Sequence, residues 1–421
     1  MVCSGARAAP PWPPDEQEAA RSDTARRMPT RTTRLSPVMA GLTLFLNPNP
    51  GEYSTWKKAR QHACGPTGCI SGRGRPRSFT TLANCDIASV RCILAYMIQC
   101  QEVNLFQDVP SNPSLWMRLN QPGLPLAQAQ IAVVGVPYDG SVTHARGAAL
   151  APAELRALSA DSWFFTEEGL DLRGLRICDL GDVSIAPEDA EATQQAITAA
   201  IRPISESGAI PLVLGGDHSI TSGAVAGVVR EHPLGVLWLD AHADLMDSYR
   251  GIGGREESRW NHACALRRIC DLPQVGPARV LLVGLRDLMA PEVAYIREQG
   301  IRAIHAHELS RLSPAAVADR ILETLGSLPG GIYISVDIDF LDPSAAPGTG
   351  VPVPGGPPSR YLLDLIHALA KRSVGPAPLR LAGLDIVEVA PPLDHNHITG
   401  WTAVRIIQEM CGLVQHAGTG R

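Results

Sequence analysis

Apolar residues form short, nearly uninterrupted runs from about residue 130 onward, spaced so that a helix can fit between successive runs. A strand that is apolar at every position, rather than at every second one, is typical of a parallel sheet buried on both faces. The runs therefore predict buried parallel strands. They occupy residues 131–136, 211–214, 235–239, 280–283, 331–336 and 379–389.

The segments between these runs carry apolar residues at a helical spacing of about 3.6 residues. Ser313-Pro314 is a helix start signal and Gly326 is a stop signal for one of them. The alternation of strand and helix predicts a three-layer α/β/α domain with a central, mostly parallel sheet over residues 125–417. The predicted helices occupy residues 187–201, 219–230, 291–298, 314–325 and 358–371.

The chain before residue 125 lacks this alternation. Residues 1–40 are rich in Ala, Pro and Arg and predict a disordered or targeting extension. Acidic residues near the start favour disorder, because transit peptides contain few of them. Residues 41–124 are interpreted as an N-terminal extension. Within it, residues 58–103 show no hydrophobic period and are interpreted as an insertion or a retained intron.

The hydrophobic fraction of 45% and mean hydropathy of +0.02 are typical of a soluble globular protein. A net charge of −5 argues against nucleic acid or an anionic membrane as a partner. No apolar run is long enough to cross a bilayer. The cysteines beyond residue 101 are too scattered for a disulfide framework. We therefore expect a cytoplasmic protein, with a mitochondrion or plastid as the alternative.

Three predicted strands end in clusters of potential metal ligands. Gly-Gly-Asp-His-Ser follows residues 211–214, Asp-Ala-His-Ala-Asp follows 235–239, and Asp-Ile-Asp follows 331–336. Sheets of this type place their functional sites at the carboxyl ends of the strands, so we expect the clusters to converge. The six candidate ligands are His218, Asp240, His242, Asp244, Asp337 and Asp339.

The charge of this set requires compensation. Four carboxylates in one buried place repel each other too strongly to stay ionised on their own. Carboxylates and imidazoles suit divalent ions of the Mn²⁺, Ni²⁺ or Zn²⁺ type. Two such ions would neutralise the carboxylates, and a pair of ions is a common device for activating water.

These motifs resemble the signatures of the ureohydrolases, the arginase and agmatinase family. Residues 215–219, 240–244 and 335–343 carry the resemblance, and residues 347–350 and 384–389 support it. The resemblance implies an arginase-like fold and two metal ions per chain, with Mn²⁺ expected and Ni²⁺ as the alternative. It implies that His218, Asp240, Asp244 and Asp337 hold one ion, and that Asp240, His242, Asp337 and Asp339 hold the other.

The resemblance also implies roles in hydrolysis. Asp244 would move a proton toward the departing amine, Glu388 would bind the substrate's guanidinium group, and His262 would shuttle protons. Relatives usually follow this histidine with Gly and, a little later, Phe. Here Ala263 and Cys264 follow instead, which changes the pocket wall and bears on the choice of substrate.

The loop at residues 138–148 resembles the agmatinase branch, whereas residues 245–249 do not repeat the arginase set that reads an amino-acid head. We therefore expect hydrolysis of agmatine to putrescine and urea, a reaction of polyamine metabolism. Guanidine or a guanidino acid is the alternative substrate. Outside the family, the alternatives are a single-zinc deacetylase and a non-catalytic binding protein. The resemblance further implies a small guanidino substrate as the binding partner and a homo-oligomer, either a trimer or a hexamer.

Overall fold

The computed structural model describes residues 105–250, 257–374 and 379–417. The predicted extension at 1–40 and the predicted insertion at 58–103 lie outside these residues. Within them, no helix is both long and apolar enough to cross a membrane.

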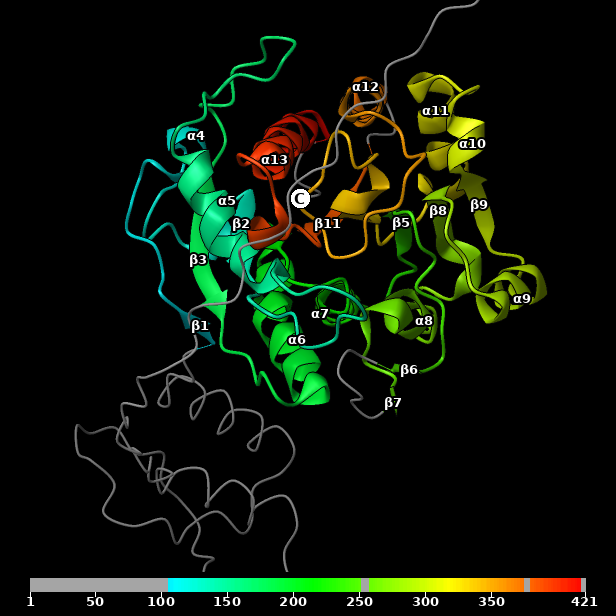
Figure 1. Ribbon diagram of the computed structural model, residues 1–421. Coiled ribbons are helices and arrows are strands. Elements are labelled where there is room, and N and C mark those ends of the chain that lie inside the picture. The colour runs from blue at the N-terminus through cyan, green and yellow to red at the C-terminus, as the bar shows by residue number, and fades with distance from the viewer. Residues whose placement is uncertain (1–104, 251–256, 375–378, 418–421) are drawn as a thin grey trace, which may run out of the picture. The chain divides into compact units, whose positions relative to one another are not determined.

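A nine-stranded sheet forms the middle layer of the domain, in the order β1-β3-β2-β4-β11-β10-β5-β8-β9 (Figure 1). Its pairs are parallel except for β1, which pairs antiparallel with β3 at one edge. The strands are β1 (Phe106–Gln107), β2 (Ile131–Gly135), β3 (Ile177–Val183), β4 (Ile210–Leu214), β5 (Gly235–Leu239), β8 (Val280–Leu285), β9 (Arg302–His305), β10 (Ile332–Asp337) and β11 (Leu381–Val387).

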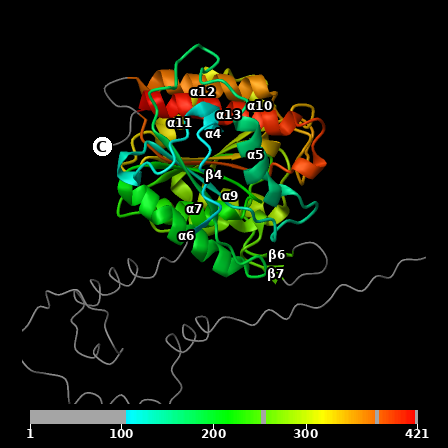
Figure 2. The ribbon, with the colours of Figure 1, turned by 90° about the vertical axis from the view of Figure 1, so that its left-hand side faces the viewer.

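Helices cover both faces of the sheet (Figure 2). One face carries α5 (Ala151–Ser159), α11 (Pro314–Leu325), α12 (Ser359–Ser373) and α13 (Ile398–Ala417), and the other carries α6 (Ala190–Ser207), α7 (Ile220–Val228) and α8 (Ala265–Cys270). Successive strand residues feed the two cores in turn, since Val133 packs into one and Val134 into the other. This arrangement confirms the predicted α/β/α fold and explains why the strands are apolar at every position.

Smaller elements complete the described domain. α4 (Leu115–Arg118) buries Trp116 and packs near α5, so residues ahead of position 125 contribute to the core as well as to the sheet edge. The remaining elements are α9 (Ala290–Gln299), α10 (Ala306–Leu309) and the short hairpin of β6 (Tyr249–Arg250) and β7 (Glu257–Ser258).

The predicted elements are all present, and their ends follow local capping chemistry. Ser313 accepts a hydrogen bond from the backbone N–H of Ala316, and α11 ends before Gly326, as expected. α6 starts at Ala190, later than predicted, because the side chain of Asp189 accepts from the Ala192 N–H and fixes the first turn there. Strands β3 and β9 and helices α5 and α13 are additions to the predicted set.

Strand register brings the ligand clusters to one edge of the sheet. β10 lies between β5 and β11, with Val336 opposite Leu239 and Asp337 opposite Val387. The residues that follow these strands therefore emerge side by side. The turn after β4 passes so close to the preceding loop that a Cβ at Gly216 would lie 1.9 Å from the carbonyl oxygen of Tyr138. Only glycine fits there.

Candidate metal centre

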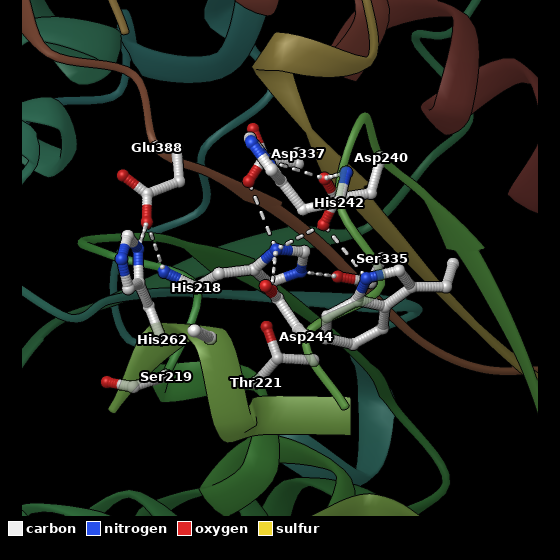
Figure 3. A network of polar contacts seen from close by, with 12 residues as sticks. His218, Ser219, Thr221, Asp240, His242, Asp244, His262, Ser335, Asp337 and Glu388 are labelled. Atoms are coloured by element: carbon white, nitrogen blue, oxygen red, sulfur yellow. Dashed lines mark hydrogen bonds and ion pairs between the residues drawn. The ribbon is translucent and has the colours of Figure 1, made fainter. Parts of the chain in front are cut away.

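The structure gathers all six predicted ligands at the carboxyl ends of β4, β5 and β10. Figure 3 shows five of them, His218, Asp240, His242, Asp244 and Asp337. All are buried except His242, whose side chain is 23% exposed. Two residues near the centre, Asp244 and Glu388, have left-handed backbone conformations with φ of 52° and 60°. Such conformations are costly for residues with a side chain and often occur at functional sites.

The inner ligand group surrounds one nitrogen of His218. Its Nδ1 lies 3.0 Å from Asp240 Oδ2, 3.1 Å from Asp337 Oδ2 and 3.3 Å from Asp244 Oδ2 (Figure 3). Three carboxylates thus approach a single imidazole nitrogen that is itself buried. This is the arrangement of donors expected around a divalent cation.

The outer ligand group surrounds His242. Its Nδ1 lies 3.1 Å from Asp339 Oδ2 and 3.5 Å from Asp240 Oδ1. Asp240 therefore contributes one oxygen to each group. The indole N–H of Trp238 donates to Asp240 Oδ2 at 2.9 Å, and the backbone N–H of His242 donates to Oδ1 at 2.6 Å. These bonds hold the shared carboxylate in the orientation that faces both groups.

The hydrogen-bond partners of His218 also suit a cation in the inner group. Ser335 Oγ donates to Asp385 Oδ1 at 2.6 Å, so its lone pair accepts from His218 Nε2 at 2.8 Å. With the proton on Nε2, Nδ1 presents a lone pair toward three carboxylates. Nδ1 is buried and forms no hydrogen bond. A divalent cation satisfies four electron-pair donors arranged in this way.

Electrostatics lead to the same requirement. Burial and then repulsion from Asp339 and Asp240 raise the pKa of Asp337 well above its ordinary value. Burial and repulsion from Asp240 likewise raise the pKa of Asp244. Without a cation, these acids resist ionisation. A pair of divalent ions would favour the carboxylate forms that bind metal.

A cavity of about 210 Å³ opens onto both ligand groups. Four candidate ligands line it, namely His242, Asp244, Asp337 and Asp339. His262 and Glu388, the predicted proton shuttle and guanidinium-binding residue, also line it. The other lining residues are Thr143, Tyr249, Ala263, Asp287, Leu288, Met289, Glu292 and Val351. His218 and Asp240 lie behind this wall. His395 and His397 lie close together in the sequence, but His397 pairs with Glu154 and neither histidine lines the cavity.

His262 and Glu388 are in direct contact. His262 Nδ1 lies 2.8 Å from Glu388 Oε1, and the same oxygen accepts from the backbone N–H of His218 at 2.9 Å. Burial opposes protonation of His262, but the hydrogen bond and charge of Glu388 outweigh it and raise the pKa of His262 to about 9. Oε2 of Glu388 accepts no hydrogen bond from the described residues, and Glu388 borders the cavity.

Thr143, which the sequence did not single out by itself, contacts the other nitrogen of His262. Its backbone N–H donates to Nε2 at 3.1 Å, and its hydroxyl lies 2.8 Å from the same nitrogen. The N–H can donate only to the unprotonated nitrogen, whereas the hydroxyl can accept from the protonated one. The raised pKa and the N–H bond therefore describe two protonation states, and Thr143 provides a partner for each.

Asp217 connects the loops around His262. Its Oδ2 accepts from the backbone N–H of Ser141, and its Oδ1 accepts from Ser219. The carbonyl of Ser141 in turn accepts from the side chain of Asn261 at 2.7 Å. Asp217 therefore supports the loops and contributes no donor to either ligand group. The sequence signal for this role is its place in a tight Gly-Gly-Asp turn.

Residues 129–412 match the model of the arginase family. The chain is 34% identical over 300 residues to proclavaminate amidinohydrolase from Streptomyces clavuligerus, covering 69% of this chain and 89% of that protein. It is 32% identical to guanidinopropionase from Pseudomonas aeruginosa, covering 76% and 96%. It is 30% identical to agmatinase from Bacillus anthracis, covering 67% and 91%.

Solved structures agree with this match. The structure of proclavaminate amidinohydrolase from Streptomyces clavuligerus aligns with a TM-score of 0.65 and 31% identity, covering 75% of this chain and 99% of that chain. The chain therefore belongs to the arginase family, as its motifs predicted. It is a hydrolase of guanidino C–N bonds that acts on small guanidino compounds, in a family that depends on paired metal ions. This assignment sets aside the deacetylase alternative.

Proposed function

We propose that the protein is an agmatinase-type ureohydrolase that converts agmatine to putrescine and urea. The observation that carries this proposal is the charge of the cavity. Among the described residues, no Lys or Arg side chain lines it, whereas Asp287 and Glu292 add carboxylates beyond the ligand groups. A substrate that is cationic at both ends, as agmatine is, suits such a wall.

The two additional carboxylates differ in availability. Both oxygens of Glu292 accept backbone N–H groups, from Leu245 at 3.0 Å and from Met289 at 2.8 Å. The side chain of Asp287 is 62% exposed, and its only described ion-pair contact is His242 Nε2 at 3.7 Å. Asp287 is therefore the carboxylate that is free to receive a substrate ammonium group. A guanidino acid would bring its carboxylate to the same place without a described cation to pair with.

The ligand groups fit two divalent cations, which we infer to be Mn²⁺. His218, Asp240, Asp244 and Asp337 would hold one ion, and Asp240, His242, Asp337 and Asp339 would hold the other. When bound, such a pair supplies the nucleophile by lowering the pKa of water toward neutrality. The acidic set also lowers the charge cost of bringing a cationic guanidinium group to this place.

The chain's own groups then bind the substrate and move protons. Glu388 directs its free Oε2 at the guanidinium group, while Oε1 holds His262. Asp244, at the floor of the cavity, passes a proton to the amine that leaves. His262 exchanges protons with solvent and stays hydrogen-bonded to Thr143 in both of its protonation states. Urea and putrescine leave through the open side of the cavity.

The test is urea release by the full-length protein after loading with Mn²⁺ or Ni²⁺. Agmatine, guanidine, 4-guanidinobutyrate, 3-guanidinopropionate and arginine are compared side by side, with the His242→Ala variant as the inactive control. We expect the highest kcat/KM for agmatine. A higher value for either guanidino acid would overturn the agmatine proposal and keep the family assignment. No urea from any compound would favour the non-catalytic binding role.

A further inference from the structure

A buried polar chain lies behind His218, away from the cavity. Ser335 connects His218 Nε2, at 2.8 Å, to Asp385 Oδ1, at 2.6 Å. The other oxygen of Asp385 accepts the hydroxyls of Thr221 and Tyr333, each at 2.8 Å. Asp385 is fully buried and does not line the cavity. Among the described residues it forms no salt bridge with Lys or Arg.

The direction of each hydrogen bond in this chain follows from the number of protons. Each hydroxyl has one proton to donate. Thr221 and Tyr333 donate theirs to the carboxylate of Asp385, and so does Ser335. Ser335 can then only accept from His218, which fixes the imidazole proton on Nε2. Nδ1 is left with its lone pair directed at the inner ligand group.

Trp238 fixes the same imidazole from its face. The indole ring stacks on the His218 ring with centroids 3.9 Å apart and planes 3° from parallel. The ring plane is therefore set by Trp238 and the proton by the Ser335–Asp385 pair. A metal-binding histidine generally needs both its orientation and its tautomer held by such partners.

We propose that Asp385 is a positioning residue for the inner metal ion: through Ser335 it holds the His218 proton on Nε2 and keeps Nδ1 available as a ligand. The inference rests on the metal centre of the proposed function but not on the substrate. An amide at position 385 can donate to Ser335 Oγ. The Ser335 proton then turns toward His218 and favours the tautomer that is protonated on Nδ1.

The test measures metal binding by the metal-free, full-length protein, using calorimetric titration with Mn²⁺. We expect two ions per chain in the wild type. In Asp385→Asn, the affinity for one ion falls by about 10- to 100-fold, while the affinity for the other stays near the wild-type value. Thr221→Val is the matched control, because it removes a hydroxyl from Asp385 and leaves the Ser335 link intact. It should keep both affinities near the wild-type values.

A second measurement reports the tautomer directly. In protein labelled with ¹⁵N-histidine and loaded with the diamagnetic ion Zn²⁺, we expect His218 to carry its proton on Nε2 and bind metal through Nδ1 in the wild type, and to carry a proton on an unbound Nδ1 in Asp385→Asn. If Asp385→Asn does not fold, as judged by circular dichroism, Ser335→Ala breaks the same link and should lose the same affinity.

Two wild-type affinities in both Asp385→Asn and Ser335→Ala would overturn the proposal, and so would an unchanged tautomer. Wild-type protein that binds two ions without releasing urea would contradict the proposed function alone. Wild-type protein that binds fewer than two ions would contradict both.

Discussion

The two ligand groups of the candidate metal centre differ in how firmly the protein holds them. In the inner group, the imidazole of His218 is buried, stacked on Trp238 and hydrogen-bonded to Ser335. In the outer group, the His242 side chain is 23% exposed, and its Nε2 lies 3.7 Å from the exposed side chain of Asp287. The inner histidine has one permitted orientation, whereas the outer histidine borders the cavity.

This difference implies that the two metal positions hold their ions with different firmness. The inner group is built into the ends of buried strands and supported from behind, so it is expected to retain its ion. The outer group lies where substrate enters and is expected to exchange its ion more readily. Asp240 belongs to both, with one oxygen directed at each histidine. The following predictions test how independent the two groups are.

The largest effect is expected for Asp240, a ligand that both groups share. Asp240→Asn removes a charge from both groups at once, so both metal affinities and the rate of urea release should fall. A loss of about 4 kcal/mol in transition-state stabilisation corresponds to a rate decrease of about a thousandfold. Steady-state kinetics and metal analysis measure the two losses. Asp319→Asn, at an exposed ion pair with Arg372, is the control and should keep wild-type activity. A variant that keeps one tightly bound ion would show that the groups are independent.

Metal removal should separate the two groups in time. Under dialysis against a chelator, we expect the outer ion to leave at least about tenfold faster than the inner one, because the imidazole of His242 lacks the outer-sphere support of His218. Metal content should therefore pass through a plateau at one ion per chain, and urea release should be lost on the first step. Simultaneous loss of both ions would contradict the division between inner and outer groups.

The sequence predicts the features that follow from the local pattern of residues, but not those that depend on distant partners. The central strands were predictable because both of their faces are buried, and the six ligands were predictable because each follows such a strand. β3 was not, because Asp179 and Asp182 interrupt its apolar run. Asp179 is buried there by pairing with Arg156 at 2.9 Å, a contact that the linear pattern cannot show.

The contacts that hold His218 and His262 in place were equally unpredictable from the sequence. Ser335 and Asp385 belong to the sequence motifs, but each lies inside a buried strand, and the linear pattern does not show that they contact each other. Thr143 contacts His262 across 119 positions of sequence. α13 escaped prediction because its buried residues, from Thr399 to Ala417, spread around the helix and blur a single apolar stripe. Long-range partners decide these features, and only the fold brings the partners together.

The next effect in size concerns pH. The pKa of His262 is raised to about 9, so a step that needs its protonated form should slow as pH rises through that value. Thr143→Val removes the hydroxyl that accepts from protonated Nε2 and destabilises that form. The pKa should fall by about one unit, since a hydrogen bond to a charged group contributes roughly 1.5 kcal/mol.

The alkaline limb of kcat should therefore move to lower pH in Thr143→Val. Thr143→Ser keeps the hydroxyl and should leave the limb in place. Rate profiles between pH 7 and 10 compare the three proteins. A limb that does not move in Thr143→Val would show that the hydroxyl is not the partner of protonated His262.

The smallest effect is expected at the rim of the outer group, where Asp287 is exposed. Asp287→Asn should raise KM for agmatine by about 2- to 5-fold, because an exposed ion pair contributes up to about 1 kcal/mol. The value of kcat should change little, since Asp287 does not reach the inner group. Added salt should raise the wild-type KM and reduce its difference from the variant, because it screens the attraction. For guanidine, which has no second cationic group, KM should not change. An equal rise in KM for both compounds would mean that Asp287 acts on the outer metal position through His242 and not on the tail of the substrate.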